Sequence, residues 1–106
     1  VDMDTVLGAV DIARKTPSVC NRQAWRVYVA KSPEAKGRVL ALQEGSRGFG
    51  ASADCLLAIA MDLRAFIGAG ERNEAYVDGG LFAMSLMITR PFPRRSWRQT
   101  AATGLR

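Results

Sequence analysis

The chain has 106 residues, of which 48% are hydrophobic and 24% are charged, a composition typical of one small globular domain. It contains no histidine, which excludes histidine-dependent acid–base catalysis, histidine-containing nucleophilic triads and the usual zinc sites, so we expect no metal. We expect a cytoplasmic protein with two reduced thiols, Cys20 and Cys55, because the sequence has no apolar run long enough to cross a membrane, no signal-peptide pattern and no disulfide framework.

The net charge of +5 is concentrated near the end of the chain. All ten acidic residues precede residue 88, and so do ten of the fifteen basic residues. The other five are Arg90, Arg94, Arg95, Arg98 and Arg106. We therefore expect a folded, neutral domain over 1–88 and a basic, arginine-rich tail over 89–106, which would bind nucleic acid only non-specifically.

The first predicted element is an amphipathic helix over residues 3–14, where apolar residues recur at helical spacing. Asp2 and Asp4 suit its start because a carboxylate can accept hydrogen bonds from the unpaired amides there. Pro17 disfavours a helical conformation at the residue before it, which predicts that the helix has ended by then. A polar loop over residues 16–24 follows.

The alternating residues 25–30 predict a strand with Val27 and Val29 on one face. Ser32, followed by a proline, predicts the start of a second helix that runs to about Gln43. A glycine then closes this helix.

A glycine-rich loop over 45–53 leads into the continuous apolar run 55–61, which is typical of a strand buried on both faces. Residues 74–88 predict a last helix. One apolar stripe runs along it: Val77, Leu81, Met84 and Ile88. This order, with connections long enough for crossovers, predicts helices packed against a sheet that needs more strands than these two.

The loop over residues 17–23 is the first candidate site, because it combines a hydroxyl, two amides and a guanidinium. Such groups could bind the polar edge of a planar heterocycle. The alternative is a turn in which Ser18 and Asn21 bond their own backbone. A second candidate is Arg47, since glycine amides beside an arginine can hold a phosphate, although a flexible loop entering a strand is the competing interpretation.

Gly79 and Gly80 interrupt the last predicted helix, where each costs about 1 kcal/mol relative to alanine. Either another backbone or a flat ligand approaches closely, or the helix begins later, near Leu81. Trp25 is expected to be structural. The methionines are expected to fill the core: Met61, Met84 and Met87.

Three segments in natural order resemble the nitroreductase-like family of FMN proteins: ARKTPSVCNRQAWRVYVA, GSRGFG and RNEAYVDGGLFAMSLM. The resemblance implies an α+β fold with helices packed on a mixed β-sheet, of which about half is present. It also implies a homodimer with FMN at its interface, and hydride transfer from NAD(P)H through FMN to a small electron-accepting substrate. By position, Pro17, Ser18 and Asn21 would contact the flavin ring, with Gln23 as a further candidate and Arg47 as a phosphate candidate. No catalytic side chain is implied.

The sequence also departs from the family pattern. The segment that grips the FMN phosphate and the second half of the family fold are missing, and Ala24 replaces a proline. The start at Val1 suggests a trimmed chain, and the tail after residue 88 suggests a shifted reading frame or a foreign join. Two interpretations therefore stay open. The first is an oxidoreductase, which is either active or truncated and inactive. The second is a non-enzymatic remnant or interaction module with a basic tail.

Overall fold

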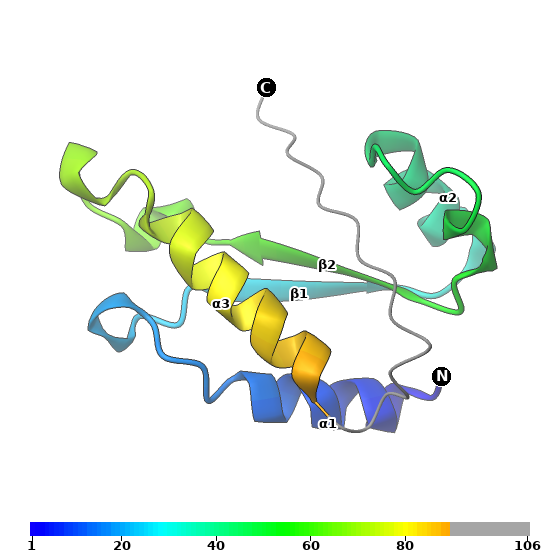
Figure 1. The fold of residues 1–106 in the computed structure, drawn as a ribbon, viewed down its shortest axis with the longest axis horizontal. Coiled ribbons are helices and arrows are strands. Elements are labelled where there is room, and N and C mark those ends of the chain that lie inside the picture. Colours follow the sequence, from blue (N-terminus) through cyan, green and yellow to red (C-terminus); the bar gives the residue numbers. More distant parts are fainter. Residues whose placement is uncertain (90–106) are drawn as a thin grey trace.

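The computed structural model describes residues 1–89, so the basic tail expected from the sequence, apart from Thr89, lies outside the described residues. Within this part, Figure 1 shows three helices around a pair of strands. Their bounds are α1, Met3–Ala13; β1, Trp25–Ala30; α2, Pro33–Leu42; β2, Leu56–Met61; and α3, Glu74–Ile88. Helices packed on a small sheet confirm the predicted α+β class.

Local sequence signals explain where α1 and α2 begin. Asp2 caps α1, because its carboxylate accepts a hydrogen bond of 2.7 Å from the amide of Thr5. Ser32 caps α2 in the same way through the amide of Ala35, and a proline occupies the first turn. Both predicted helix starts are confirmed.

The two strands pair antiparallel, with Trp25 opposite Met61 and Ala30 opposite Leu56. The connection between them, although long enough for a crossover, does not make one, and the two-stranded part of the sheet formed by residues 1–89 is antiparallel. The physical reason lies in α2, which has no buried residue. A crossover helix lies on a face of the sheet and buries an apolar side there, whereas Figure 1 shows α2 beyond one end of the strands.

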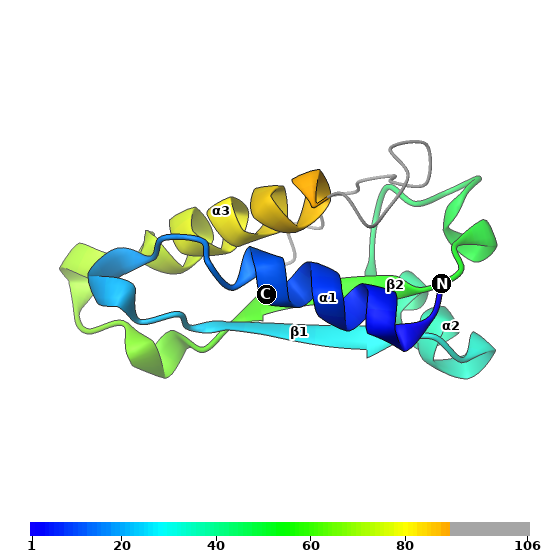
Figure 2. The same cartoon turned by 90° about the horizontal axis from the view of Figure 1, so that it is seen from below.

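The hydrophobic core lies between one face of the strands and the helices α1 and α3; Figure 2 shows α3 along one side of the strands. Trp25 stacks on Phe82 of α3, with their ring centres 4.8 Å apart, which confirms its structural role. The other buried members of the core come from the two helices: Val6, Ala9, Ala13 and Leu86.

No residue of β2 is fully buried, so the expectation of a strand buried on both faces is wrong for the described chain. Leu57, Ile59 and Met61 pack against the core from one face. Successive side chains of a strand point to opposite faces, so Leu56 and Ala58 face away from this core. Within residues 1–89 the helices α1 and α3 thus cover one side of the sheet and leave the other uncovered.

The helix α3 begins at Glu74, so the alternative in which it begins near Leu81 is wrong. A Cβ atom on Gly79 would lie 3.2 Å from Cγ and 3.3 Å from the sulfur of Met61. A Cβ atom on Gly80 would meet nothing within 4 Å. Close packing of α3 against β2 therefore accounts for Gly79, and nothing in the described chain accounts for Gly80.

The apolar stripe of α3, defined by Val77, Leu81, Met84 and Ile88, is exposed, with accessible fractions from 46 to 67%. Met84 is therefore not the core residue that we expected, whereas Met61 and Met87 are half-buried. A different face of α3, with Phe82 and Leu86, packs into the core. Although α3 is apolar on both faces, no helix within residues 1–89 is long and apolar enough to cross a membrane.

Candidate cofactor-binding site

The loop 17–23, between α1 and β1, has an unusual backbone. Cys20, Asn21 and Gln23 adopt positive φ angles of 49°, 54° and 51°. Residues other than glycine rarely adopt this left-handed conformation, although asparagine tolerates it better than most. Such strained residues cluster at functional sites, where the surrounding structure holds them in place. The backbone therefore singles out the same loop as the side-chain chemistry.

Three polar side chains of this loop lie together. The Ser18 hydroxyl accepts a hydrogen bond of 3.0 Å from the amide of Gln23, and Asn21 Oδ1 accepts one of 2.8 Å from the side-chain amide of Gln23. The turn interpretation holds for Ser18, whereas Asn21 bonds a side chain. A hydroxyl that accepts a bond can still donate its own proton, and the amide of Asn21 carries two N–H donors. The loop thus offers both donors and acceptors.

Arg22 ties the loop to the connection between β2 and α3. Its guanidinium donates to the carboxylate of Glu71 at 2.8 Å and to the carbonyl oxygen of Ala65 at 2.9 Å, and it lies 6.0 Å from the ring centre of Phe66. The hydrogen bond from Arg22, together with one from the amide of Ile67, lowers the pKa of Glu71 below its usual 4.5. The guanidinium is therefore engaged within the fold, and its role is to anchor the loop.

Asp78 ties the same loop to α3. Its side chain is only 3% exposed, and its two carboxylate oxygens accept from the amide of Val19 at 3.1 and 3.3 Å. The sequence analysis gave Asp78 no role, although an acidic residue inside an apolar helix was the available signal. Asp78 is not part of a metal-binding group, since no three His, Cys, Asp or Glu side chains of residues 1–89 could hold a metal ion together.

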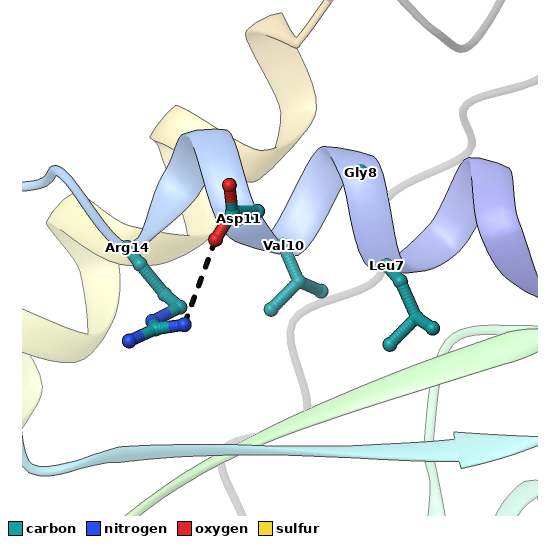
Figure 3. Close-up of a pocket in the computed structure, with 5 residues that line it drawn as sticks. All are labelled: Leu7, Gly8, Val10, Asp11 and Arg14. Atoms are coloured by element: carbon teal, nitrogen blue, oxygen red, sulfur yellow. Dashed lines mark ion pairs between the residues drawn. The ribbon is translucent and has the colours of Figure 1, made fainter.

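A shallow, open depression of about 350 Å³ lies beside the loop and is lined by Val10, Arg14, Gln23, Trp25, Arg26 and Val27. It shares Val10 and Arg14 with another of about 410 Å³ along α1, where Figure 3 shows Leu7, Val10 and Arg14 on the same side of the helix. Sequence reasoning missed Arg14 and Arg26, because nothing in their spacing shows that a helix end and a strand converge on Gln23.

Arg47 does not lie near this loop. The strand register places residues 17–23 and the connection after Met61 at one end of the sheet, and the glycine-rich loop before β2 at the other end. Figure 1 shows the same separation, with α2 and the loop that follows it opposite the loop before β1. A strand of six residues spans about 17–20 Å. The role of Arg47 as a phosphate ligand stays a prediction, and Arg47 is distant from the polar groups of the loop 17–23.

Comparisons with known proteins place this geometry in a wider context. No family model and no curated protein matches the sequence. Among solved structures, an enone reductase of gut-bacterial fatty acid saturation metabolism matches with a TM-score of 0.70 and 19% identity, over 82% of this chain and 59% of its own. A protein named as an NAD(P)H:FMN oxidoreductase, from Staphylococcus epidermidis, matches with a TM-score of 0.66 and 21% identity, over 82% of this chain and 57% of its own.

A third similar structure is a nitroreductase with bound FMN from Desulfitobacterium hafniense, with a TM-score of 0.54 and 25% identity over 81% of this chain and 52% of its own. The chain therefore spans between about half and three fifths of the length of these three proteins. Their matches cover the front part of this chain, which contains the loop 17–23. This part of the chain has a partial nitroreductase-like fold.

Proposed function

We propose that the chain belongs to an FMN-dependent oxidoreductase of nitroreductase type, which uses a reduced nicotinamide to reduce a small electron-accepting substrate. FMN would supply the hydride chemistry when bound, and the protein would bind and orient it. The observation that carries the proposal is the polar loop 17–23, with its left-handed backbone, in a fold similar to that of an FMN-bound nitroreductase.

The side chains of the loop suit the ring of a flavin. The pyrimidine edge of such a ring alternates carbonyl acceptors with an N–H donor, so a binding loop must offer both kinds of partner. Ser18 can donate its hydroxyl proton, Asn21 can donate its amide, and the side-chain carbonyl of Gln23 can accept. Pro17, which is exposed at the start of the loop, offers an apolar edge to the ring. These residues would orient the ring, and none of them is proposed as a catalytic side chain.

We also propose that the protein is a homodimer. The exposed apolar stripe of α3 supports this, because a monomer would leave its four large side chains in water. The open space beside Gly80, on the exposed side of α3, would let another backbone approach closely. A cytoplasmic location is consistent with Cys20 and Cys55, both of which are free thiols.

A titration of the purified protein with FMN, followed by visible absorption, tests the function. We expect a perturbed flavin spectrum, and we expect Asn21→Ala to weaken binding by about tenfold through the loss of one hydrogen bond to the ring. Asn73→Ala is the matched control, because Asn73 is exposed and its side chain makes no capping bond to α3. This variant should bind like the unchanged protein.

Two results would contradict the proposal. One is a protein that leaves the flavin spectrum unchanged at every concentration, which would favour the alternative of a non-enzymatic module whose arginine-rich tail binds acidic surfaces through charge. The other is an affinity for FMN that falls equally in Asn21→Ala and in Asn73→Ala, which would show that the loop 17–23 does not bind the flavin.

A further inference from the structure

The buried carboxylate of Asp78 holds the residue that directly precedes the left-handed part of the candidate loop. It reaches the loop from α3, 59 residues further along the chain, and accepts from the amide of Val19 with both oxygens. A carboxylate with 3% exposure is unfavourable unless hydrogen bonds compensate for its lost hydration. The position of Asp78 therefore depends on the loop, and the loop depends on Asp78.

Val19 is the first residue of a 3₁₀ turn, Val19–Asn21, whose N-cap residue is Ser18. A serine at this position commonly caps the turn with its own hydroxyl. Here Ser18 makes no capping bond, and its hydroxyl accepts from Gln23 instead. The carboxylate of Asp78 takes over the capping of the turn.

The two anchors of the loop bracket two of its three left-handed residues. Asp78 holds Val19 on one side, Glu71 holds Arg22 on the other, and Cys20 and Asn21 lie between them. Strained backbone of this kind persists only where the surroundings hold it. Releasing one anchor should let Asn21 relax to an ordinary conformation and change the direction of its amide.

We propose that Asp78 is a positioning residue of the flavin-binding loop, which caps the 3₁₀ turn through the amide of Val19 and so presents Ser18 and Asn21 to the ring. This inference rests on the proposed function for the identity of the ligand. The contact between Asp78 and Val19 does not depend on that function, so the two can be tested separately.

The first measurement is amide hydrogen exchange by NMR in the full chain. The amide of Val19 should be protected in the unchanged protein and should lose protection in Asp78→Ala, which removes both acceptor oxygens, while the core amides of Phe82 and Leu86 stay protected. Asp11→Ala is the matched control, because Asp11 lies on α1 and, among residues 1–89, forms a surface ion pair with its helix neighbour Arg14. A Val19 amide that exchanges equally fast in the unchanged protein and in Asp78→Ala would overturn the proposal.

The second measurement is a riboflavin titration of a double-mutant cycle. Val19→Pro removes the donor without changing any residue of α3, and the extended backbone of Ser18 suits the residue before a proline. We expect Asp78→Ala and Val19→Pro each to weaken binding by about ten- to a hundredfold, the range for a hydrogen bond to a charged group. The double variant should be no weaker than the weaker single one.

The outcomes separate the two proposals. If Asp78→Ala does not fold, Val19→Pro alone decides, and unchanged riboflavin affinity in that variant overturns the role of Asp78. Additive losses in the double variant also overturn it. If the unchanged protein binds neither riboflavin nor FMN, the proposed function fails, and the exchange at Val19 still decides whether Asp78 holds the loop.

Discussion

Gly79 and Gly80 are adjacent residues in the same helix, yet their surroundings differ. The side chain of Met61 lies close to Gly79, whereas the space beside Gly80 is open. Inside a helix each glycine costs about 1 kcal/mol relative to alanine, because it retains more freedom in the unfolded chain. The two positions therefore allow packing and helix propensity to be measured separately.

Gly80→Ala should raise the free energy of unfolding by about 1 kcal/mol. Gly79→Ala should raise it less, since its new methyl group would press on the side chain of Met61, which must shift by a few tenths of an ångström. Urea unfolding of both variants at low protein concentration measures the difference. A larger gain for Gly79→Ala would contradict the close packing of α3 on β2.

The chemistry of the site residues was more predictable than their geometry. The hydroxyl and amides of residues 17–23 identified the loop as a candidate, and Ser18, Asn21 and Gln23 do lie together. The left-handed backbone was not predictable, because Gln23 has no local preference for it. The role of Asp78 was not predictable either, because it depends on a contact across 59 residues of sequence.

At the scale of the elements, β1 and α3 have the bounds that their sequence patterns predict, 25–30 and 74–88. Alternation and helical spacing are local properties, so one segment is enough to recognise them. The pairing direction of β1 and β2 depends instead on where the long connection runs. The weakly apolar surface of α2, which leaves none of its residues buried, was the sequence signal that argued against a crossover.

The ion pair of Arg22 with Glu71 joins two elements and should depend on pH. The pKa of Glu71 is lowered below 4.5, first of all by the hydrogen bond from Arg22. A carboxylate with a lowered pKa stabilises the folded state above its unfolded pKa, and this contribution is lost as the pH falls through the folded value. The pair should therefore anchor the loop fully above pH 4.5 and release it progressively at lower pH.

Amide exchange of Arg22 and Gln23, followed from neutral pH to below 4.5, measures this release. After correction for the intrinsic effect of pH on exchange, protection should fall in the unchanged protein. In Glu71→Gln it should be low at every pH, because glutamine cannot form the ion pair. A pH dependence that persists in Glu71→Gln would show that another group releases the loop.

The exposed stripe of α3 should mediate association between two copies of the chain. Leu81→Gln places a polar amide at its centre and should shift a monomer–dimer equilibrium towards monomer. Leu42→Gln is the matched control, because Leu42 is 88% exposed on α2, at the far end of the sheet. Sedimentation across a concentration series measures both, and an unchanged protein that stays monomeric throughout would contradict the proposed dimer.

At the scale of the whole molecule, the candidate groups for the two ends of FMN are separated. The ring-binding groups lie in the loop 17–23, and Arg47 lies at the opposite end of the strands. Two arginines lie closer, in the depression beside Gln23, but each already faces a carboxylate. Arg14 pairs with Asp11 at 3.5 Å, and Arg26 pairs with Asp62 at 3.3 Å.

The charge of Asp62 persists down to strongly acidic conditions. Its hydrogen bonds from Arg64 lower its pKa from 3.8 to about 2, and its single negative charge is shared between Arg64 at 2.7 Å and Arg26 at 3.3 Å. Both arginines of the depression thus face a carboxylate, which weakens them as partners for a phosphate. Binding at the loop 17–23 should therefore depend mainly on the ring.

Riboflavin, which lacks the phosphate, should accordingly bind nearly as well as FMN, with less than about a tenfold difference in dissociation constant, or about 1.4 kcal/mol. Parallel fluorescence titrations of the full chain with both ligands measure the ratio. A much larger preference for FMN would reveal a phosphate contact, and Arg14→Gln, Arg26→Gln and Arg47→Gln would then identify it. The variant that makes the two affinities equal would mark the arginine that binds the phosphate, and unchanged ratios in all three would assign that contact to another residue of the chain.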